Sequence, residues 1–338
     1  MPPRLALAWV SGTRFREQDF GKRTGNKTFG NQKWIVSAIV YLTRRGTFCA
    51  VGDRLAGALW RAGGNDQLTG DPEQPVRNLK LILSYDGTDF AGWQVQPGRD
   101  TIQGTLASAI GRLTGENVLP QGSGRTDAGV HALAQVASFQ TASIIPADNL
   151  VAALNHILPA SIRVLEVVEA HPDFHPRRSA LAKTYRYRIC RAPICPPFLA
   201  RYVWHFPYPL DEEAMIASAV DAVGEHDFTS FAAVDPDRVE RMTAGVGEGD
   251  QDLTQPAPSN IRKIFSSSWV REGEEFVYTV RGNGFLHHMV RNLVGTFILV
   301  GKGSLSREDL QRILAARNRS AAGPTAPATG LFLVNVEY

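Results

Sequence analysis

The pattern of apolar and polar positions predicts a series of strands and helices from about residue 78 to the end of the chain. Short segments that are apolar, or that alternate between apolar and polar positions, predict strands. Apolar positions that recur every three or four residues behind a capping residue predict helices. The predicted strands are 78–84, 132–140, 162–168, 184–190, 261–270, 275–281 and 331–336. The predicted helices are 102–113, 146–157, 211–223, 285–300 and 306–316.

Strands and helices follow one another in a similar order in both halves of this region, which predicts an α+β fold. We expect two similar lobes of mixed, largely antiparallel sheet flanked by helices, with a central cleft between them. The first predicted lobe covers residues 76–178, and the second covers residues 179–338.

Two segments depart from this order. Residues 1–75 show no sustained helical or alternating pattern of apolar residues. Residues 1–70 carry 11 Lys and Arg against 4 Asp and Glu, whereas the remainder of the chain has a net charge of −4. We expect this N-terminal extension to be disordered or dispensable. Residues 235–259 are rich in Gly and Pro and contain six acidic residues, which predicts a mobile acidic surface loop.

The stretch from Gly122 to Phe139 contains the best candidate for chemistry. Asp127 is the one carboxylate in it, and a cation, Arg125, lies two residues earlier. Three glycines permit positive φ and a close approach of the backbone to a ligand. These are Gly122, Gly124 and Gly129. We therefore interpret Asp127 as a nucleophile or base, with an Asx-turn residue that orders a tight loop as the alternative.

The run Gly124–His131, followed by Gln135–Phe139, resembles the signature of the TruA family of tRNA pseudouridine synthases. Other segments resemble that family in the same order, from about Leu79 to Tyr338. They are Tyr85–Thr88, Gly92–Gln94, Thr101–Gln103, Lys183–Tyr187, Asp227–Phe231 and His287–Asn292. The resemblance implies the pseudouridine synthase fold, an RNA-binding role for the central cleft, and a homodimer.

The resemblance also implies roles for four residues. Asp127 would be the nucleophile on a flipped-out uridine, and Arg125 would help to flip it. Tyr185 would stack on the target base and could assist proton removal from C5. Arg291 would pair with Asp127 and hold its pKa at or below the reference value of roughly 3.9. Each of the last three also has a structural alternative. Arg125 could bind a phosphate or a carbonyl group of the loop, Tyr185 could be a half-buried aromatic residue of a strand, and Arg291 could extend from its helix to the surface.

A basic segment from 174 to 210 predicts an RNA-binding surface. It contains seven basic residues and no acidic residue, with aromatic residues interleaved. Phosphate groups favour such a surface, and unstacked bases stack on aromatic rings. The basic residues are Arg177, Arg178, Lys183, Arg186, Arg188, Arg191 and Arg201. A solvated basic face is the alternative.

Other patterns argue against a metal centre and a membrane anchor. The three cysteines cannot form a disulfide framework and fit a reducing cytosol. Adjacent His287 and His288 would point about 100° apart on the predicted helix, so we expect no metal site. The apolar run from Trp34 to Leu42 is far shorter than the roughly 20 residues that cross a bilayer.

The resemblance to this family thus implies an isomerase that converts uridine to pseudouridine in the tRNA anticodon stem-loop, and the cysteine content favours a cytoplasmic location. Its expected partner is tRNA, and we expect neither cofactor nor metal. One alternative is a non-catalytic RNA-binding or tRNA-folding protein of the same fold. Another is a nucleoside hydrolase or glycosidase that uses Asp127, although no second catalytic acid is visible beside it.

Overall fold

The computed structural model describes residues 75–234 and 259–338, which belong to one compact unit from Gly70 to Tyr338. The predicted extension (1–75) and the predicted loop (235–259) therefore lie, apart from one end residue each, outside the described residues. Both stay predictions, as do the lobe boundaries at 76–178 and 179–338.

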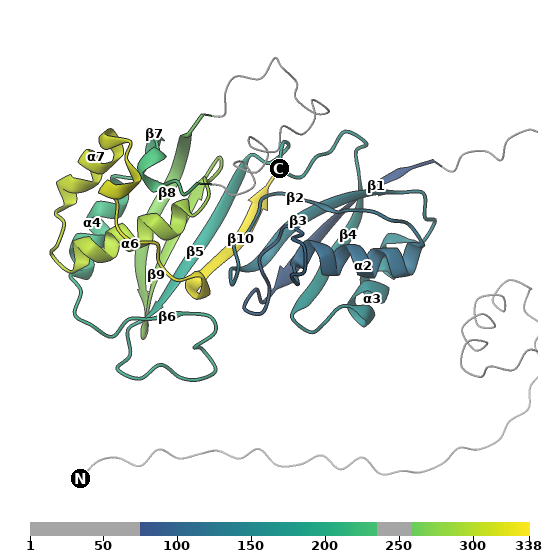
Figure 1. Cartoon of the computed structure of the whole chain (residues 1–338), viewed down its shortest axis with the longest axis horizontal. Helices are drawn as coiled ribbons and strands as arrows, with labels where there is room; N and C mark the ends of the chain where they lie inside the picture. The colour runs from purple at the N-terminus through teal and green to yellow at the C-terminus, as the bar shows by residue number, and fades with distance from the viewer. Residues whose placement is uncertain (1–74, 235–258) are drawn as a thin grey trace, which may run out of the picture. The chain divides into compact units, whose positions relative to one another are not determined.

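A ten-stranded mixed sheet forms the centre of this unit (Figure 1). The path through it is β4-β1-β3-β10-β5-β9-β8-β7, with β2 paired to β3 and β6 paired to β5. All neighbours are antiparallel except β3 with β10 and β5 with β6. The strands are β1 (Arg77–Tyr85), β2 (Gln121–Gly122), β3 (His131–Thr141), β4 (Ile162–Ala170), β5 (Ala182–Cys190), β6 (Trp204–His205), β7 (Gly224–Asp227), β8 (Ile261–Glu272), β9 (Glu275–Gly282) and β10 (Leu331–Glu337).

The last strand, β10, joins the two halves of the sheet. It pairs in parallel with β3 and antiparallel with β5, so it lies between the halves, where Figure 1 shows it in yellow. The sequence predicted this strand but not its central place. The segment that leads into β10 approaches both halves, since Pro324 lies against Gly295 and Ala328 lies against Gly129.

Helices lie against both halves of the sheet. Figure 1 shows α2 and α3 beside β1, β3 and β4, and α4, α6 and α7 beside β8 and β9. The predicted α+β fold with a mixed, largely antiparallel sheet is confirmed. The helices are α2 (Ile102–Thr114), α3 (Ala147–Ile157), α4 (Glu212–Val220), α6 (Met289–Gly301) and α7 (Arg307–Ala316), with 3₁₀ turns η1 (Thr229–Phe231), η2 (Arg319–Ala321) and η3 (Ala328–Gly330).

Helix α6 begins later than the sequence predicted. The predicted start was residue 285, but the helix begins at Met289, behind His288 at φ 60°. This left-handed conformation is uncommon for a residue with a Cβ. It marks the point where the non-helical segment after β9 turns into the helix. Residues 285–288 therefore form a bend rather than a helical turn, which changes where two histidine side chains point.

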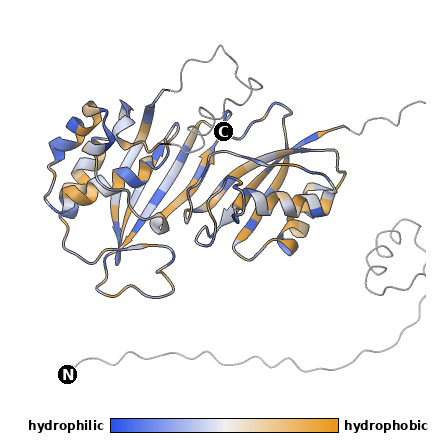
Figure 2. Cartoon of the chain, viewed as in Figure 1, coloured by the Kyte–Doolittle hydropathy of each residue, from blue (hydrophilic) through white to orange (hydrophobic). Residues whose placement is uncertain are grey.

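The hydrophobic core holds these elements together. In the first half, Leu81 of β1 and Leu106 of α2 are fully buried. In the second half, the rings of Tyr278 in β9 and Phe297 in α6 lie 5.3 Å apart. Figure 2 shows apolar residues along the strands of both halves and mixed faces on the helices. The core thus gives β3 and α6 a rigid base, and these two elements carry the site described below.

Gly295 allows the segment before β10 to pack directly on α6. A Cβ at position 295 would overlap the carbonyl oxygen of Pro324. We expect Gly295→Ala to lower the free energy of unfolding by about 1–3 kcal/mol, because overpacking forces a backbone shift. Denaturant unfolding measures the change. The control is Gly111→Ala in α2, which should change stability by less than about 1 kcal/mol. Equal losses would contradict the explanation.

Candidate active site

Asp127 lies in the loop between β2 and β3, with its side chain 19% exposed. The backbone turns directly after it, because the amide of Val130 donates to the Asp127 carbonyl at 3.1 Å. Among the described residues, no backbone amide donates to the carboxylate, so the Asx turn of the alternative interpretation is not formed. The carboxylate is held by other side chains and keeps part of its surface open.

A buried hydrogen-bond network fixes the loop beneath Asp127. The Thr126 carbonyl accepts from the amide of Trp93 at 3.0 Å, and its hydroxyl lies 2.8 Å from the hydroxyl of Tyr85. Burial raises the pKa of Tyr85 to about 12, so this phenol keeps its proton. The Gln135 side chain donates to the Gly124 carbonyl at 2.9 Å. Together these bonds place Asp127 with little freedom to move.

The loop glycines serve different purposes from the one expected. Of the three, only Gly129 has a positive φ, at 77°. A Cβ at Gly122 would lie 2.6 Å from the ring of Trp93, and one at Gly124 would lie 3.0 Å from Nζ of Lys183. Gly122 thus makes room for a core side chain and Gly124 for a lysine, and neither adopts the positive φ that a glycine permits.

Arg291 of α6 contacts the Asp127 carboxylate, as the family resemblance implied. Its Nη1 donates to Oδ2 at 2.9 Å, and the two side chains are 15% and 19% exposed. Its Nε donates to the Ala326 carbonyl at 2.7 Å, in the segment before β10. The surface alternative for Arg291 is therefore excluded. The guanidinium is oriented from two sides, by the carboxylate and by a backbone carbonyl.

His287 and His288 also converge on Asp127. Their Nε2 atoms lie 3.4 Å from Oδ1 and 3.3 Å from Oδ2, and the ring centroids are 4.0 Å apart. The prediction that these rings diverge was wrong, because both residues precede α6 instead of lying on it. Sequence reasoning therefore missed two neighbours of the carboxylate. No local signal marked the later start, because His288 makes no side-chain capping hydrogen bond ahead of Met289.

The charges around Asp127 keep its carboxyl group ionised. Burial alone would raise the pKa of Asp127, but the hydrogen bond from His287, the charge of His288 and the contacts of Arg291 together lower it below its ordinary value. Burial lowers the pKa of His288, against the opposing attraction of Asp127. At neutral pH the carboxylate is therefore charged and its fixed counter-charge is Arg291.

Tyr185 of β5 lies beside this cluster. Its side chain is buried, and its ring meets that of Phe285 edge-on at a centroid distance of 4.9 Å. Burial, with the nearby Tyr85 and Asp127, raises the pKa of Tyr185. Among the residues that the structure describes, no hydrogen-bond partner faces its hydroxyl. Tyr187, two residues on, differs because its hydroxyl donates to the Pro327 carbonyl at 2.7 Å.

Comparison with known proteins decides the family. A family model described as tRNA pseudouridine synthase matches residues 81–177 and 219–338, which is more than half of the chain. The chain therefore belongs to the tRNA pseudouridine synthase family. This confirms the predicted class of enzyme, an isomerase that acts on uridine in tRNA.

Members of this family from several bacteria are similar over most of the described region. The tRNA pseudouridine synthase A of Solibacter usitatus is 50% identical over 263 residues, covering 78% of this chain and 100% of that protein. Those of Moorella thermoacetica and Rhodospirillum centenum are each 45% identical, over 77% and 78% of this chain and 99% and 100% of theirs. About a fifth of this chain thus has no counterpart in these relatives.

A solved structure titled "Crystal Structure of a Cbf5-Nop10-Gar1 Complex" matches much more weakly. The TM-score is 0.28 at 10% identity, over 75% of this chain and 57% of that one. This likeness is too low to support a conclusion, so the family assignment rests on the sequence comparisons.

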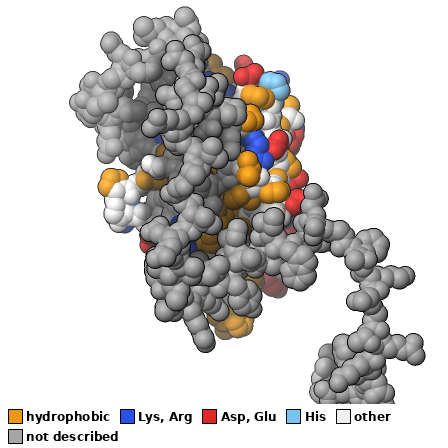
Figure 3. Space-filling model, turned by 90° about the vertical axis from the view of Figure 1, so that its right-hand side faces the viewer, with side chains coloured by type: hydrophobic (Ala, Val, Ile, Leu, Met, Phe, Trp, Pro, Cys, Tyr) orange, Lys and Arg blue, Asp and Glu red, His pale blue; other side chains and the backbone are white. Residues whose placement is uncertain are grey.

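The basic segment of this pseudouridine synthase is not uniformly available to RNA. Three of its seven cations form ion pairs with acids distant in the sequence. These pairs are Arg188 with Glu275, Arg191 with Glu212, and Arg201 with Asp89 and Asp86. The other four form no ion pair with any described residue. The described part of the surface in Figure 3 also shows acidic and basic side chains side by side.

Arg125 is exposed on the loop two residues before Asp127. Its predicted role in flipping the target nucleotide stays a prediction. The helices of the described ranges also lack the length and apolar character that a bilayer crossing requires.

Asp127, His287 and His288 are spaced so that they could hold a metal ion, since their ligand atoms lie within 4.8 Å of one another. The Arg291 guanidinium beside the same carboxylate opposes a second cation there. We expect turnover to be unchanged after dialysis against EDTA, as judged by the rate of pseudouridine formation. A loss of activity that added Zn²⁺ restores would contradict this prediction.

Proposed function

We propose that this chain isomerises uridines of the tRNA anticodon stem-loop to pseudouridine, with Asp127 as nucleophile on a flipped-out uridine. The observation that carries the proposal is the Asp127 carboxylate itself. It is mostly buried, held by Arg291 at 2.9 Å, and kept ionised by its surroundings. An ionised carboxylate in a fixed position is what covalent catalysis by an aspartate requires.

The reaction exchanges one bond for another without adding or removing atoms. The bond between N1 and C1′ of uridine breaks, the base turns in the pocket, and C5 forms a bond to C1′. N1 gains a proton and C5 loses one, so the composition is unchanged. We assign to Asp127 the attack that allows the glycosidic bond to break, while Arg291 holds the carboxylate ionised and aligned.

Two further residues are assigned to binding the nucleotide. Tyr185 would stack on the target base, because its ring lies next to the Asp127 cluster and its hydroxyl faces no described partner. Its raised pKa counts against a role as base in the free enzyme. Arg125 would occupy the space that the flipped nucleotide leaves. Such extrusion costs a few kcal/mol, which contacts in the pocket offset.

Two features favour isomerisation over the alternative functions. A non-catalytic RNA-binding protein would have no need of a buried carboxylate oriented by three cationic or imidazole groups. A glycosidase would need a second carboxyl group beside the bond that breaks. From Gly122 to Phe139 the chain carries no carboxylate other than Asp127, and the side chains that hold Asp127 are Arg291, His287 and His288.

The proposal is tested by incubating the full-length protein with an unmodified tRNA transcript. We expect pseudouridine within the anticodon stem-loop and no release of free uracil. Modification confined to another part of the tRNA would contradict the proposed position. Release of free uracil would show a hydrolase instead.

We infer in addition that the enzyme forms a homodimer, as the family resemblance implied, and that it acts in the cytoplasm, as its cysteine content suggested. Sedimentation equilibrium should then give about twice the chain mass of 37.0 kDa. A mass of one chain at micromolar concentration would contradict the dimer without affecting the proposed reaction.

A further inference from the structure

Three basic side chains near the catalytic loop lie together without an acidic partner. They are Lys183 at the start of β5, Arg262 at the start of β8, and Arg177 in the segment before β5. None of them forms an ion pair with any residue in 75–234 or 259–338. Some arginines of the same region are neutralised by glutamate or aspartate, as Arg188 is by Glu275.

The geometry places this basic cluster next to Asp127. Lys183 donates from Nζ to the Ser123 carbonyl at 2.5 Å, four residues before the catalytic aspartate. A Cβ at Gly124 would lie 3.0 Å from the same Nζ. Across the sheet, Lys183 is paired with Gly282. The Nε of Arg262 lies 3.6 Å from where a Cβ of Gly284 would be. Glycines thus leave space around both cations.

The cations repel one another in the free protein. Burial and the charges of Arg177 and Arg262 lower the pKa of Lys183 to about 8. Burial and the charge of Arg177 likewise lower the pKa of Arg262. Like charges held together at a partly buried site are unfavourable unless an anion joins them. The arrangement is therefore suited to a ligand that brings a negative charge.

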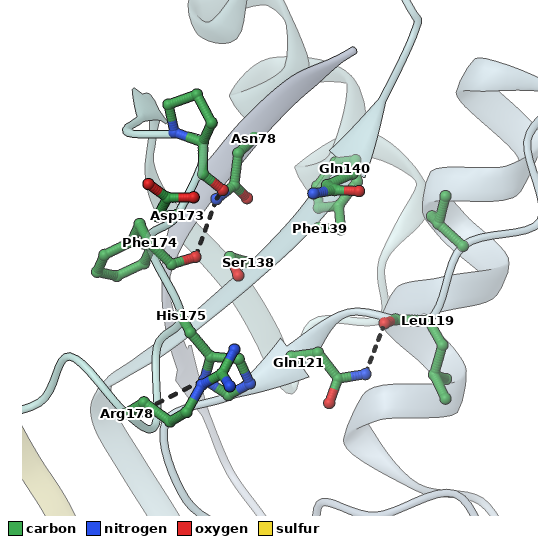
Figure 4. A pocket seen from close by; sticks show the side chains of 12 residues that line it. Asn78, Leu119, Gln121, Ser138, Phe139, Gln140, Asp173, Phe174, His175 and Arg178 are labelled. Atoms are coloured by element: carbon green, nitrogen blue, oxygen red, sulfur yellow. Dashed lines mark hydrogen bonds between the residues drawn. The ribbon is translucent and has the colours of Figure 1, made fainter. Parts of the chain in front are cut away.

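A pocket of about 550 Å³ is lined in part by Arg178, the residue that follows Arg177. Figure 4 shows His175 and Arg178 on one side of it, with Gln121 opposite. Arg177 is the neighbour of Arg178 and helps to lower the pKa of His175, while Gln121 precedes Ser123 by two residues. The segment that carries Arg177 thus also contributes to the lining of this pocket, through His175 and Arg178.

We propose that Lys183, Arg177 and Arg262 bind one phosphate group of the tRNA backbone next to the target nucleotide. This inference rests on the proposed function for the identity of the ligand. A phosphate supplies acceptor oxygens for several donors at once, and ammonium and guanidinium groups are its usual partners in proteins. Anchoring this phosphate holds the RNA chain beside the flipped uridine and contributes to the binding free energy of the tRNA.

The test compares binding of a full-length tRNA transcript to Arg177→Gln, Arg262→Gln and the double variant over a range of salt concentrations. Each single variant should bind about tenfold more weakly at low salt, as expected for a lost charge-assisted contact. The plot of log K against the logarithm of the salt concentration should become less steep. Its slope should change by roughly 0.7–0.9, the amount expected when one phosphate contact is lost. Because both residues share one phosphate, the double variant should lose no more slope than one single variant.

The control is Arg163→Gln in β4. Arg163 and Arg262 occupy equivalent places, each one residue into a strand, and each donates from Nη1 to two nearby backbone carbonyls. Arg163→Gln removes one positive charge, as Arg262→Gln does, but at a site away from the basic cluster. It should leave the affinity for tRNA and the slope of the salt dependence unchanged. An equal effect of Arg163→Gln would show a general charge effect and overturn the proposal.

The remaining outcomes separate this inference from the proposed function. At saturating tRNA, the rate of pseudouridine formation by Arg177→Gln should remain within a few-fold of wild type, with the effect confined to KM. Unchanged binding by all cluster variants overturns the phosphate site even if the wild-type protein makes pseudouridine. Weaker binding by those variants supports the site even if the wild-type protein makes no pseudouridine, in which case only the proposed reaction fails.

Discussion

Asp127→Asn is expected to lower the rate of pseudouridine formation at least about 10⁴-fold, the size of loss seen when an essential catalytic group is removed. An amide has nearly the same shape as the carboxylate but cannot act as the nucleophile. The reaction can be followed by release of tritium from tRNA labelled at C5 of uridine, since C5 loses its hydrogen. Binding of tRNA should persist.

The matched control is Asp221→Asn. Asp221 is also paired with an arginine, Arg307, and its side chain is 18% exposed, close to that of Asp127. It lies just after α4, and its pairing has no part in the site. We expect this variant to retain full activity. Comparable losses in both variants would mean that disruption of ion pairs, rather than loss of the nucleophile, explains the effect.

Arg291→Met is expected to slow turnover by about 10²- to 10³-fold, as removal of one aligned electrostatic group does in other enzymes. It should also change the pH dependence. In the wild type the pKa of Asp127 lies below its ordinary value because its neighbours more than offset burial. Without the guanidinium, burial is less opposed and the pKa rises. Activity of the variant should therefore fall as pH decreases across a range where the wild type is still fully active.

Two further variants give this prediction its controls. Arg291→Lys keeps a positive charge but cannot reproduce both contacts, to Asp127 and to the Ala326 carbonyl. Arg291→Lys should restore the wild-type pH dependence at low pH more fully than it restores the rate at neutral pH. Arg307→Met removes the arginine that pairs with Asp221 and should change neither. A pH profile of Arg291→Met identical to the wild type would refute the role assigned to this contact.

Most of the fold followed from the sequence because its signals are local. The helix predicted at 102–113 matches α2, whose N-cap Thr101 accepts from the amide of Gly104 and whose C-cap Gly115 has φ 77°. Strand β5 was predicted at 184–190 and forms at Ala182–Cys190. Such caps and alternations depend on neighbouring residues alone.

What the sequence did not predict depends on distant contacts. The central place of β10 is set by pairing with β3 and β5, which lie far away in the chain. The late start of α6 depends on the bend at His288, and the convergence of His287 on Asp127 follows from that bend. Arg188 appeared in the sequence as part of a basic surface, but Glu275 lies beside it only in the folded sheet.

The candidate site was predictable in outline through its resemblance to a family. The Asp127 loop and its contact with Arg291 were both expected on that basis, and the contact is present. The roles of Tyr185 and Arg125 stay predictions. The buried network through Thr126 and Gln135, which fixes the loop, could not be predicted, since no local pattern distinguishes a buried glutamine from an exposed one.

The most direct test of the central claim is nucleotide-resolution mapping of pseudouridine on one tRNA transcript, treated in parallel with wild-type protein and Asp127→Asn. We predict pseudouridine in the anticodon stem-loop with the wild type, and none with the variant under conditions where it binds the tRNA equally well. Pseudouridine formed at wild-type levels by Asp127→Asn would contradict the assignment of the nucleophile. Binding of tRNA without product from either protein would contradict the proposed reaction.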